Sequence, residues 1–134
     1  MDPITEVTRA VIDRVYEAYL AGSAEGMLAE MAEDATVTFV GHGTFRGKDE
    51  IRRYMTWAGP QLVDLKFNIR AKIVDGEHAA VPWDETARTK RGKPWEAIGC
   101  DVWRVVNGKI VELTCIGDTD KVLRLLEPWP PASF

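Results

Sequence analysis

The stretch that most constrains the fold is the run from Trp95 to Asp118, WEAIGCDVWRVVNGKIVELTCIGD. It contains two apolar segments joined by Asn107-Gly108, a pair typical of tight hairpin turns because both turn positions need positive φ. The run therefore predicts two antiparallel strands with their turn at residues 107–108. One acidic residue (Asp101) lies inside the first strand, and another (Asp118) closes the second strand.

The segments before this hairpin predict three helices and a strand. Apolar residues recur at three- and four-residue steps over residues 4–21, which is the period of an amphipathic helix. Ser23 is placed to cap a second, shorter helix, and an extended strand is expected at 35–40. Gly41-His42-Gly43 interrupts that strand as a turn or a bulge. A third helix is predicted from Lys48 to Trp57.

Long strands follow the helices. Residues 62–74 alternate apolar and polar side chains, so we expect one unbroken strand with one face on a core and one in water. A strand at 77–89, the central hairpin and a last helix at 119–127 complete the chain. This order predicts an α+β fold in which three N-terminal helices pack on the concave face of a cone-shaped, curved antiparallel sheet. We expect residues 1–134 to form a single domain.

Composition and charge limit the partners. The chain has 134 residues and a formal net charge of −4, with no block of Lys and Arg, so the basic surface typical of nucleic-acid binding is missing. No apolar run approaches the roughly 20 residues that span a bilayer. The N-terminus lacks the basic and then apolar pattern of a signal peptide. We therefore expect a cytoplasmic protein that binds neither nucleic acid nor a membrane.

The two cysteines are consistent with a cytoplasmic location. Pairing about the 107–108 turn puts Cys100 roughly opposite Cys115, so a bridge between them is geometrically open. Two free thiols are favoured because the cytosol keeps thiols reduced. Two cysteines and two distant histidines do not make a zinc site, and no metal or organic cofactor is expected.

Three short motifs carry a resemblance that covers nearly the whole chain. They are residues 21–27 followed by 33–37, then residues 46–51, and finally 101–104 followed by 107–110. In this order and spacing they resemble the nuclear-transport-factor-2-like superfamily, and within it the SnoaL-like cyclases and ketosteroid isomerases. The resemblance implies a cystatin-like barrel whose cone encloses an apolar pocket. It does not fix an activity, because this fold hosts isomerases, cyclases, dehydratases, epoxide hydrolases and binding proteins.

The resemblance implies a role for Asp101. This residue occupies the position of the oxyanion-hole aspartic acid of ketosteroid isomerases, which an apolar site keeps protonated so that it donates a hydrogen bond. The alternative is an exposed Asp101 paired with Arg88 or Arg104. The general base of those isomerases corresponds to Phe39 here. Because a phenyl ring cannot abstract a proton, steroid isomerisation by that mechanism is not expected.

Several other residues are expected to line the pocket. Tyr16, or Tyr19 one turn further on, is the candidate phenol donor. Glu85 shares a strand face with Val81 and Trp83, which would point it inward near Asp101, although an outward Glu85 is favoured for a charged residue. The full set of expected substrate-binding residues is Tyr16, Tyr19, Phe39, Tyr54, Trp83, Glu85 and Trp103.

Two further residues are candidates for proton transfer. Asp118 matches the acid/base aspartate that SnoaL-like cyclases carry after a Gly-Lys-Ile strand, where it would serve an intramolecular aldol closure. Its alternative role is the cap of the last helix. His42 is a candidate base because histidine titrates near neutral pH. A loop histidine without such a role is equally compatible with the sequence.

The expected function is a cofactor-independent lyase or isomerase. It would be a SnoaL-like acid/base cyclase, isomerase or dehydratase acting on a hydrophobic, oxygenated small molecule of polyketide or steroid type. One alternative is a non-enzymatic ligand-binding or dimerisation domain, since the outer sheet face offers an apolar patch for a homodimer: Ile98, Cys100, Val102 and Val106.

A second alternative is an epoxide hydrolase of the limonene-epoxide type. The resemblance implies that such an enzyme places an Asp-Arg-Asp set in the cone, to activate water and to protonate the epoxide. The candidates for this set are Asp101, Asp118 and either Arg88 or Arg104.

Overall fold

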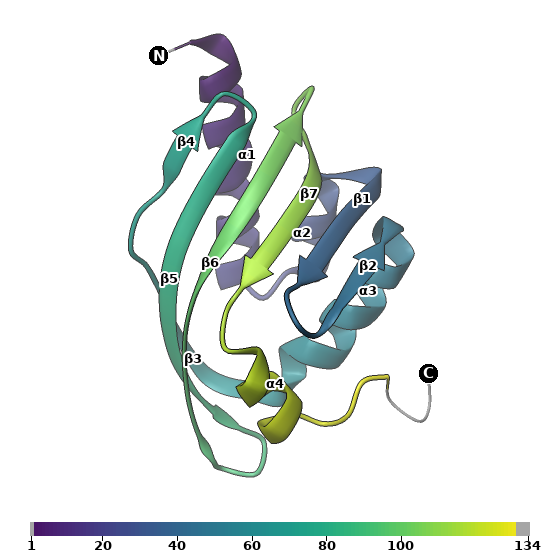
Figure 1. The fold of residues 1–134 in the computed structure, drawn as a ribbon, viewed down its shortest axis with the longest axis vertical. Helices are drawn as coiled ribbons and strands as arrows, with labels where there is room; N and C mark the ends of the chain where they lie inside the picture. Colours follow the sequence, from purple (N-terminus) through teal and green to yellow (C-terminus); the bar gives the residue numbers. More distant parts are fainter. Residues whose placement is uncertain (1, 131–134) are drawn as a thin grey trace.

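The computed structural model describes residues 2–130, apart from the side chain of Leu123; Met1 and residues 131–134 of the expected domain lie outside it. Helices and strands follow one another in the order drawn in Figure 1. They are α1 (Pro3–Leu20), α2 (Ala24–Ala29), β1 (Met31–Phe39), β2 (Gly43–Arg46), α3 (Gly47–Ala58), a 3-10 turn η1 (Gly59–Gln61), β3 (Leu62–Ile69), β4 (Ile73–Asp75), β5 (His78–Thr89), β6 (Pro94–Val106), β7 (Lys109–Ile116) and α4 (Thr119–Leu125).

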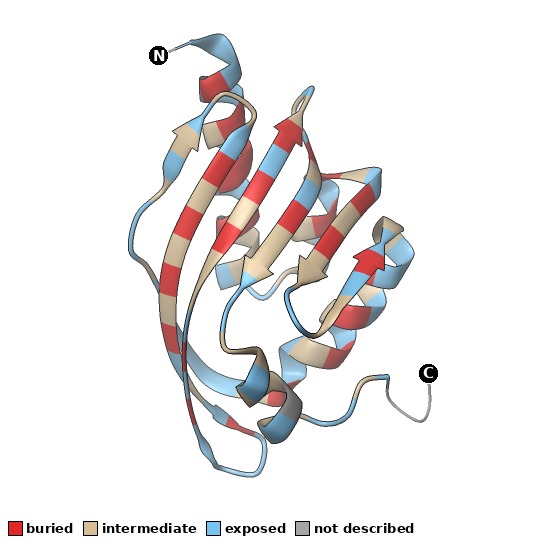
Figure 2. Cartoon of the chain, viewed as in Figure 1, coloured by how far each residue is buried: buried red, intermediate tan, exposed pale blue. Residues whose placement is uncertain are grey.

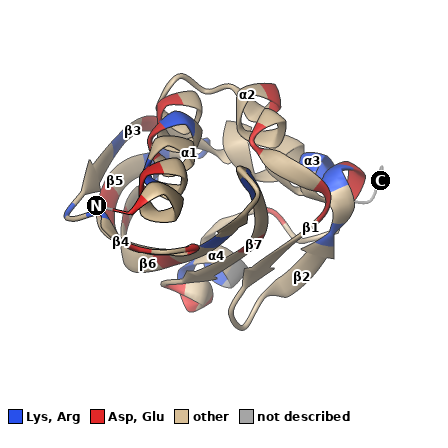
Figure 3. Ribbon diagram, turned by 90° about the horizontal axis from the view of Figure 1, so that it is seen from above, with Lys and Arg blue, Asp and Glu red and all other residues tan. Residues whose placement is uncertain are grey.

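All strands belong to one curved sheet in the order β2-β1-β7-β6-β5-β3, with β4 paired to β5. The expected α+β fold is confirmed, and the three N-terminal helices lie on one side of the sheet (Figure 3). The sheet is mixed rather than wholly antiparallel, because β1 runs parallel to β7. A parallel pair needs a long crossover, and α3 with the strands β3 to β6 supplies it.

Capping side chains start the first two helices. Asp2 accepts a hydrogen bond from the Thr5 backbone N–H at 2.9 Å and starts α1, and Ser23 accepts from the Gly26 N–H at 2.9 Å and starts α2 as expected. Such caps satisfy backbone donors that the first helical turn leaves unpaired. No helix among residues 2–130 is long and apolar enough to cross a membrane.

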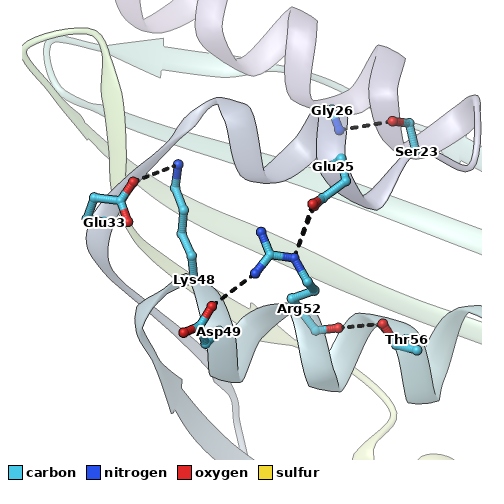
Figure 4. A network of polar contacts seen from close by, with 8 residues as sticks. All are labelled: Ser23, Glu25, Gly26, Glu33, Lys48, Asp49, Arg52 and Thr56. Atoms are coloured by element: carbon cyan, nitrogen blue, oxygen red, sulfur yellow. Dashed lines mark hydrogen bonds and ion pairs between the residues drawn. The ribbon is translucent and has the colours of Figure 1, made fainter.

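Polar contacts hold α2 against α3 (Figure 4). The Arg52 guanidinium donates to Glu25 at 3.2 Å and to Asp49 at 3.0 Å, and the Lys48 ammonium lies 3.4 Å from Glu33 on β1. These pairs are largely solvent-exposed, so each contributes little to stability.

The strand expected at 62–74 is broken at residues 70–72. Ile69 pairs with Trp83 on the inner face, but after the break it is Val74 that pairs with the buried Ala79. Before the break the odd-numbered side chains point to the core, and after it the even-numbered ones do. Ile73 is therefore 61% exposed instead of buried. β2 was not expected, and α4 ends at Leu125 instead of 127.

The central hairpin forms as predicted, with φ of 51° at Asn107 and 75° at Gly108. Its register contains one irregularity: Val105 pairs with Ile110, but Arg104 pairs with Glu112, which leaves Val111 as an extra residue. A bulge of this kind shifts every later pair by one position. Asp101 is therefore opposite Cys115, whereas Cys100 is opposite Ile116. Both thiols are free.

This register is testable by disulfide trapping. In a Cys100→Ser, Cys115→Ser background, cysteines introduced at Val102 and Thr114 should bridge on mild oxidation, because these residues are directly paired and paired Cα atoms lie about 4.5–5.5 Å apart. Intact mass would show the loss of two hydrogens. The wild type is the control, because Cys100 and Cys115 would bridge in a hairpin without the bulge. A bridge in the native wild type would contradict the assigned register.

Candidate functional site

A cavity of about 630 Å³ lies between the helices and the concave face of the sheet. Its wall is mainly apolar and aromatic, as expected for a small-molecule site. All seven expected substrate-binding residues border it, and so do Asp101, His42 and Asp118. Phe67 and Cys115 also line the cavity and were not expected there, and Trp95 borders it as well.

Asp101 lies on the inner face of β6 and is only 9% exposed. Figure 2 shows the alternation of buried and more exposed residues along β5 and β6 that directs this side chain inward. Arg88 and Arg104, the alternative partners, instead contact Asp64 and Glu77 outside the cavity. The prediction that Asp101 faces the pocket is confirmed.

Neutral donors surround the Asp101 carboxyl. One oxygen accepts a hydrogen bond from the Tyr16 hydroxyl at 2.5 Å, and the other accepts from the Trp83 indole N–H at 3.0 Å. The Trp103 indole N–H donates in turn to the Tyr16 oxygen at 3.0 Å. Burial raises the pKa of Asp101, while hydrogen bonds from Tyr16, Trp83 and Cys115 partly oppose this rise.

These hydrogen bonds leave the Tyr19 hydroxyl, and not that of Tyr16, available to donate to a ligand. Tyr16 directs its proton to Asp101, so that hydroxyl is already engaged. The Tyr19 hydroxyl has no hydrogen-bond partner within residues 2–130 and borders the cavity. Burial, with the nearby charges of Glu85 and Asp101, raises the pKa of Tyr19, so the phenol stays protonated at neutral pH and can donate a hydrogen bond.

Glu85 points inward, so the favoured outward orientation was wrong. It is 8% exposed and lies opposite Phe67 on β3 and Ala97 on β6. Its carboxyl accepts a hydrogen bond from the Trp95 indole N–H at 2.8 Å. Burial raises the pKa of Glu85, the Trp95 hydrogen bond lowers it, and the charge of Asp101 raises it further. The alternation through Val81 was the signal for this orientation.

His42 lies in the turn between β1 and β2, with its ring stacked on Trp57 at 6.0 Å between centroids. Its Nε2 is buried and has no hydrogen-bond partner among residues 2–130. Burial lowers the pKa of His42, which favours the neutral imidazole at neutral pH. Because Nε2 is enclosed, it cannot reach a ligand in the cavity unless the ring moves.

Asp118 follows the end of β7 at the mouth of the cavity. It occupies the N-cap position of α4, but its side chain makes no capping hydrogen bond. Its carboxyl instead accepts from the Ile98 backbone N–H at 3.0 Å, with the Lys121 ammonium 3.9 Å away. β7 ends at Ile116, so the strand alternation no longer fixes the direction of the Asp118 side chain, which borders the cavity.

The geometry thus defines a domain with an enclosed, mainly apolar cavity and an acid buried among aromatic side chains. The comparisons agree with this class. The SnoaL-like domain family matches residues 12–113, so the chain belongs to that family. No curated protein matches the chain.

Solved structures show the same fold. An NTF2-like protein of unknown function from Burkholderia pseudomallei is 22% identical, with a TM-score of 0.81 over 91% of this chain and 98% of that one. A protein described as a SnoaL-like polyketide cyclase from Jannaschia sp. CCS1 is 13% identical, with a TM-score of 0.83 over 98% of both chains. One described as a ketosteroid isomerase from Kribbella flavida is 21% identical, with a TM-score of 0.71 over 95% of this chain and 85% of that one.

Gly99 determines whether Trp83 can reach Asp101. The Trp83 ring crosses over this glycine, and a Cβ at Gly99 would lie 2.5 Å from the ring and 2.6 Å from the Ile116 carbonyl oxygen. Such distances force the ring or the strand to move. Gly99 is therefore a positioning residue for the donor that Trp83 supplies.

Gly99→Ala should weaken the hydrogen bond between Trp83 and Asp101. The ¹⁵N–¹H signal of the Trp83 indole, assigned with Trp83→Phe, should move toward the position of an unbonded indole. Because Asp101 then loses a donor, its pKa should rise further above the ordinary value. Gly43→Ala is the matched control, since its new Cβ would meet Phe45 at an ordinary 3.6 Å. An unchanged Trp83 signal in Gly99→Ala would refute the positioning role.

Proposed function

We propose that this protein is an enzyme that moves a proton on a hydrophobic, oxygenated small molecule bound in the cavity. The observation that carries the proposal is the Asp101 carboxyl, held by Tyr16 and Trp83 at 2.5 and 3.0 Å inside an apolar wall. A carboxylate has about four lone-pair positions. Tyr16, Trp83 and Cys115 occupy three of them, which leaves one position to accept a proton from a substrate.

The proposed chemistry begins with removal of a proton from a carbon beside a carbonyl. Asp101 accepts this proton, and the Tyr19 phenol donates a hydrogen bond to the enolate oxygen that forms. The raised pKa of Asp101 brings it closer to that of a weakly acidic carbon, which favours the transfer. Returning the proton to another carbon gives an isomerase, while attack of the enolate on a second carbonyl gives a cyclase.

Asp118 is assigned a second proton-transfer role at the mouth. One of its oxygens is fixed by the Ile98 N–H, which orients the carboxyl without neutralising it. His42 is less suited to this step because its Nε2 is enclosed. The epoxide hydrolase alternative receives no support, since no arginine is among the described residues that line the cavity.

Hydrogen–deuterium exchange beside a carbonyl tests the step that cyclases, isomerases and dehydratases of this type share. With 2-tetralone and larger polycyclic ketones as probes, the wild type should accelerate exchange measured by mass spectrometry. Asp101→Asn should reduce the rate by about 10²–10⁴-fold, the usual contribution of a positioned acid or base. The wild-type rate should rise with pH through the raised pKa of Asp101, because only the ionised carboxyl accepts the proton.

Asp84→Asn is the matched control, because Asp84 lies on the same sheet but faces away, toward Asn68 and Arg70. Asp118→Asn should reduce turnover less than Asp101→Asn if its role is secondary. Exchange that survives Asp101→Asn would rule out the assignment. Saturable binding of the probes without exchange would favour the non-enzymatic binding domain.

We also propose that two copies pair through the outer face of the sheet. Ile98 and Ile116 are 54% and 49% exposed there, and Ile116 is paired with Cys100 on the neighbouring strand. Light scattering should give about twice the 15.0 kDa of one chain. Ile98→Lys should convert the dimer to monomer. A wild-type monomer at micromolar concentration would contradict this pairing.

A further inference from the structure

The cavity wall carries two interior carboxyl groups and, among the described residues, no cationic side chain to match them. Glu85 and Asp101 both lie inside, and among the described lining residues there is no lysine or arginine. Asp118 at the mouth has Lys121 3.9 Å away. Lys72 lies 6.0 Å from the centre of the Tyr16 ring, but its ammonium is bound to Asp13 at 2.7 Å. The interior therefore suits a cation far better than an anion.

The two interior acids differ in how their oxygens are used. Both oxygens of Asp101 accept a hydrogen bond, from Tyr16 and from Trp83. Only one oxygen of Glu85 does so, from Trp95. The second Glu85 oxygen has no hydrogen-bond partner within residues 2–130, and Glu85 borders the cavity. Glu85 is thus the acid with one whole carboxyl oxygen left for a ligand, whereas each oxygen of Asp101 already accepts one hydrogen bond.

Aromatic rings surround this acid. Phe67 is the direct cross-strand neighbour of Glu85, and the ring centres of Tyr19 and Trp83 lie 5.0 and 5.5 Å from that of Phe67. Trp95 contributes its indole N–H to the carboxyl. A carboxylate close to several aromatic side chains is the kind of environment that binds organic ammonium ions, because the ring quadrupoles attract positive charge.

We infer that the cavity binds a hydrophobic organic cation, a protonated or quaternary amine, with its nitrogen at Glu85 and its oxygenated carbon near Asp101. The inference rests on the proposed function, whose substrate class it narrows. Glu85 pairs with Ala97, four residues from Asp101 on β6, so the two acids are about 13 Å apart along the strands. The ligand must be long enough to reach both, which a fused-ring or biaryl amine is.

Three benzyl compounds, of which the cation and the neutral compound have the same shape, separate charge from hydrophobicity. They are benzyltrimethylammonium, its neutral carbon isostere neopentylbenzene, and phenylacetate as the anion. Titration of the full chain, followed by the indole ¹⁵N–¹H signals of Trp83 and Trp95, gives a dissociation constant for each. We expect the cation to bind about tenfold or more tightly than the isostere, and phenylacetate to bind most weakly.

Glu85→Gln keeps the size and a hydrogen-bond acceptor for Trp95 but removes the charge. It should abolish the preference for the cation and leave the affinity for neopentylbenzene unchanged. Glu85→Asp, which keeps the charge, should retain part of the preference. Asp84→Asn removes a carboxylate from the opposite face of the same strand and should change nothing.

The inference is overturned if the three ligands bind equally to the wild type, if phenylacetate binds most tightly, or if Glu85→Gln keeps the cation preference. The wild-type comparison decides the matter even if Glu85→Gln does not fold. This failure is distinct from failure of the proposed function, which depends on Asp101 and on exchange of a substrate proton. Loss of exchange in Asp101→Asn together with equal binding of the three ligands would leave the enzyme assignment standing without the amine.

Discussion

The structure depends on how the Asp101 carboxyl is held in an apolar interior. Its partners are the phenol of Tyr16 and the indole of Trp83, both neutral, so the carboxyl is hydrogen-bonded without being paired to a cation. An arginine at this place would hold the pKa of the acid low, whereas neutral donors only partly offset burial. Two other residues keep these neutral donors in place. Trp103 orients the Tyr16 hydroxyl, and Gly99 leaves space for the Trp83 ring.

Burying two acids has a cost that varies with pH. The pKa values of Asp101 and Glu85 are raised above 3.8 and 4.5, so the folded chain binds these protons more tightly than the unfolded chain. The free energy of unfolding therefore falls as pH rises from the ordinary values through the raised ones. A bound cation acts in the opposite direction, because it stabilises the ionised form. The same charge that weakens the empty fold then contributes to binding.

Much of the site could be predicted because it rests on strict alternation along one strand. That pattern placed Asp101 on the inner face with Trp103, and the tight turn at 107–108 was evident from its residue types. The bulge at Val111 could not be predicted, because no glycine or proline in the sequence indicates it. This bulge alone puts Cys115 opposite Asp101. Glu85 was misplaced because the general preference of charged residues for water was given more weight than its position in the pattern.

The two acids project from paired strands, whereas the mouth of the cavity is bordered by a short helix. This difference affects ligand specificity. Asp101 and Glu85 project from β6 and β5, which are paired along most of their length, so their positions are fixed by backbone hydrogen bonds. The mouth is bordered by the short helix α4, and Glu127, two residues after its end, is held by its N–H to the Gln61 side chain at 2.7 Å and by an exposed ion pair with Arg91 at 3.0 Å. Precise proton transfer needs the rigid part. Changes in α4 can therefore alter which ligands enter without moving either carboxyl, so substrate choice and chemistry are separable in this fold.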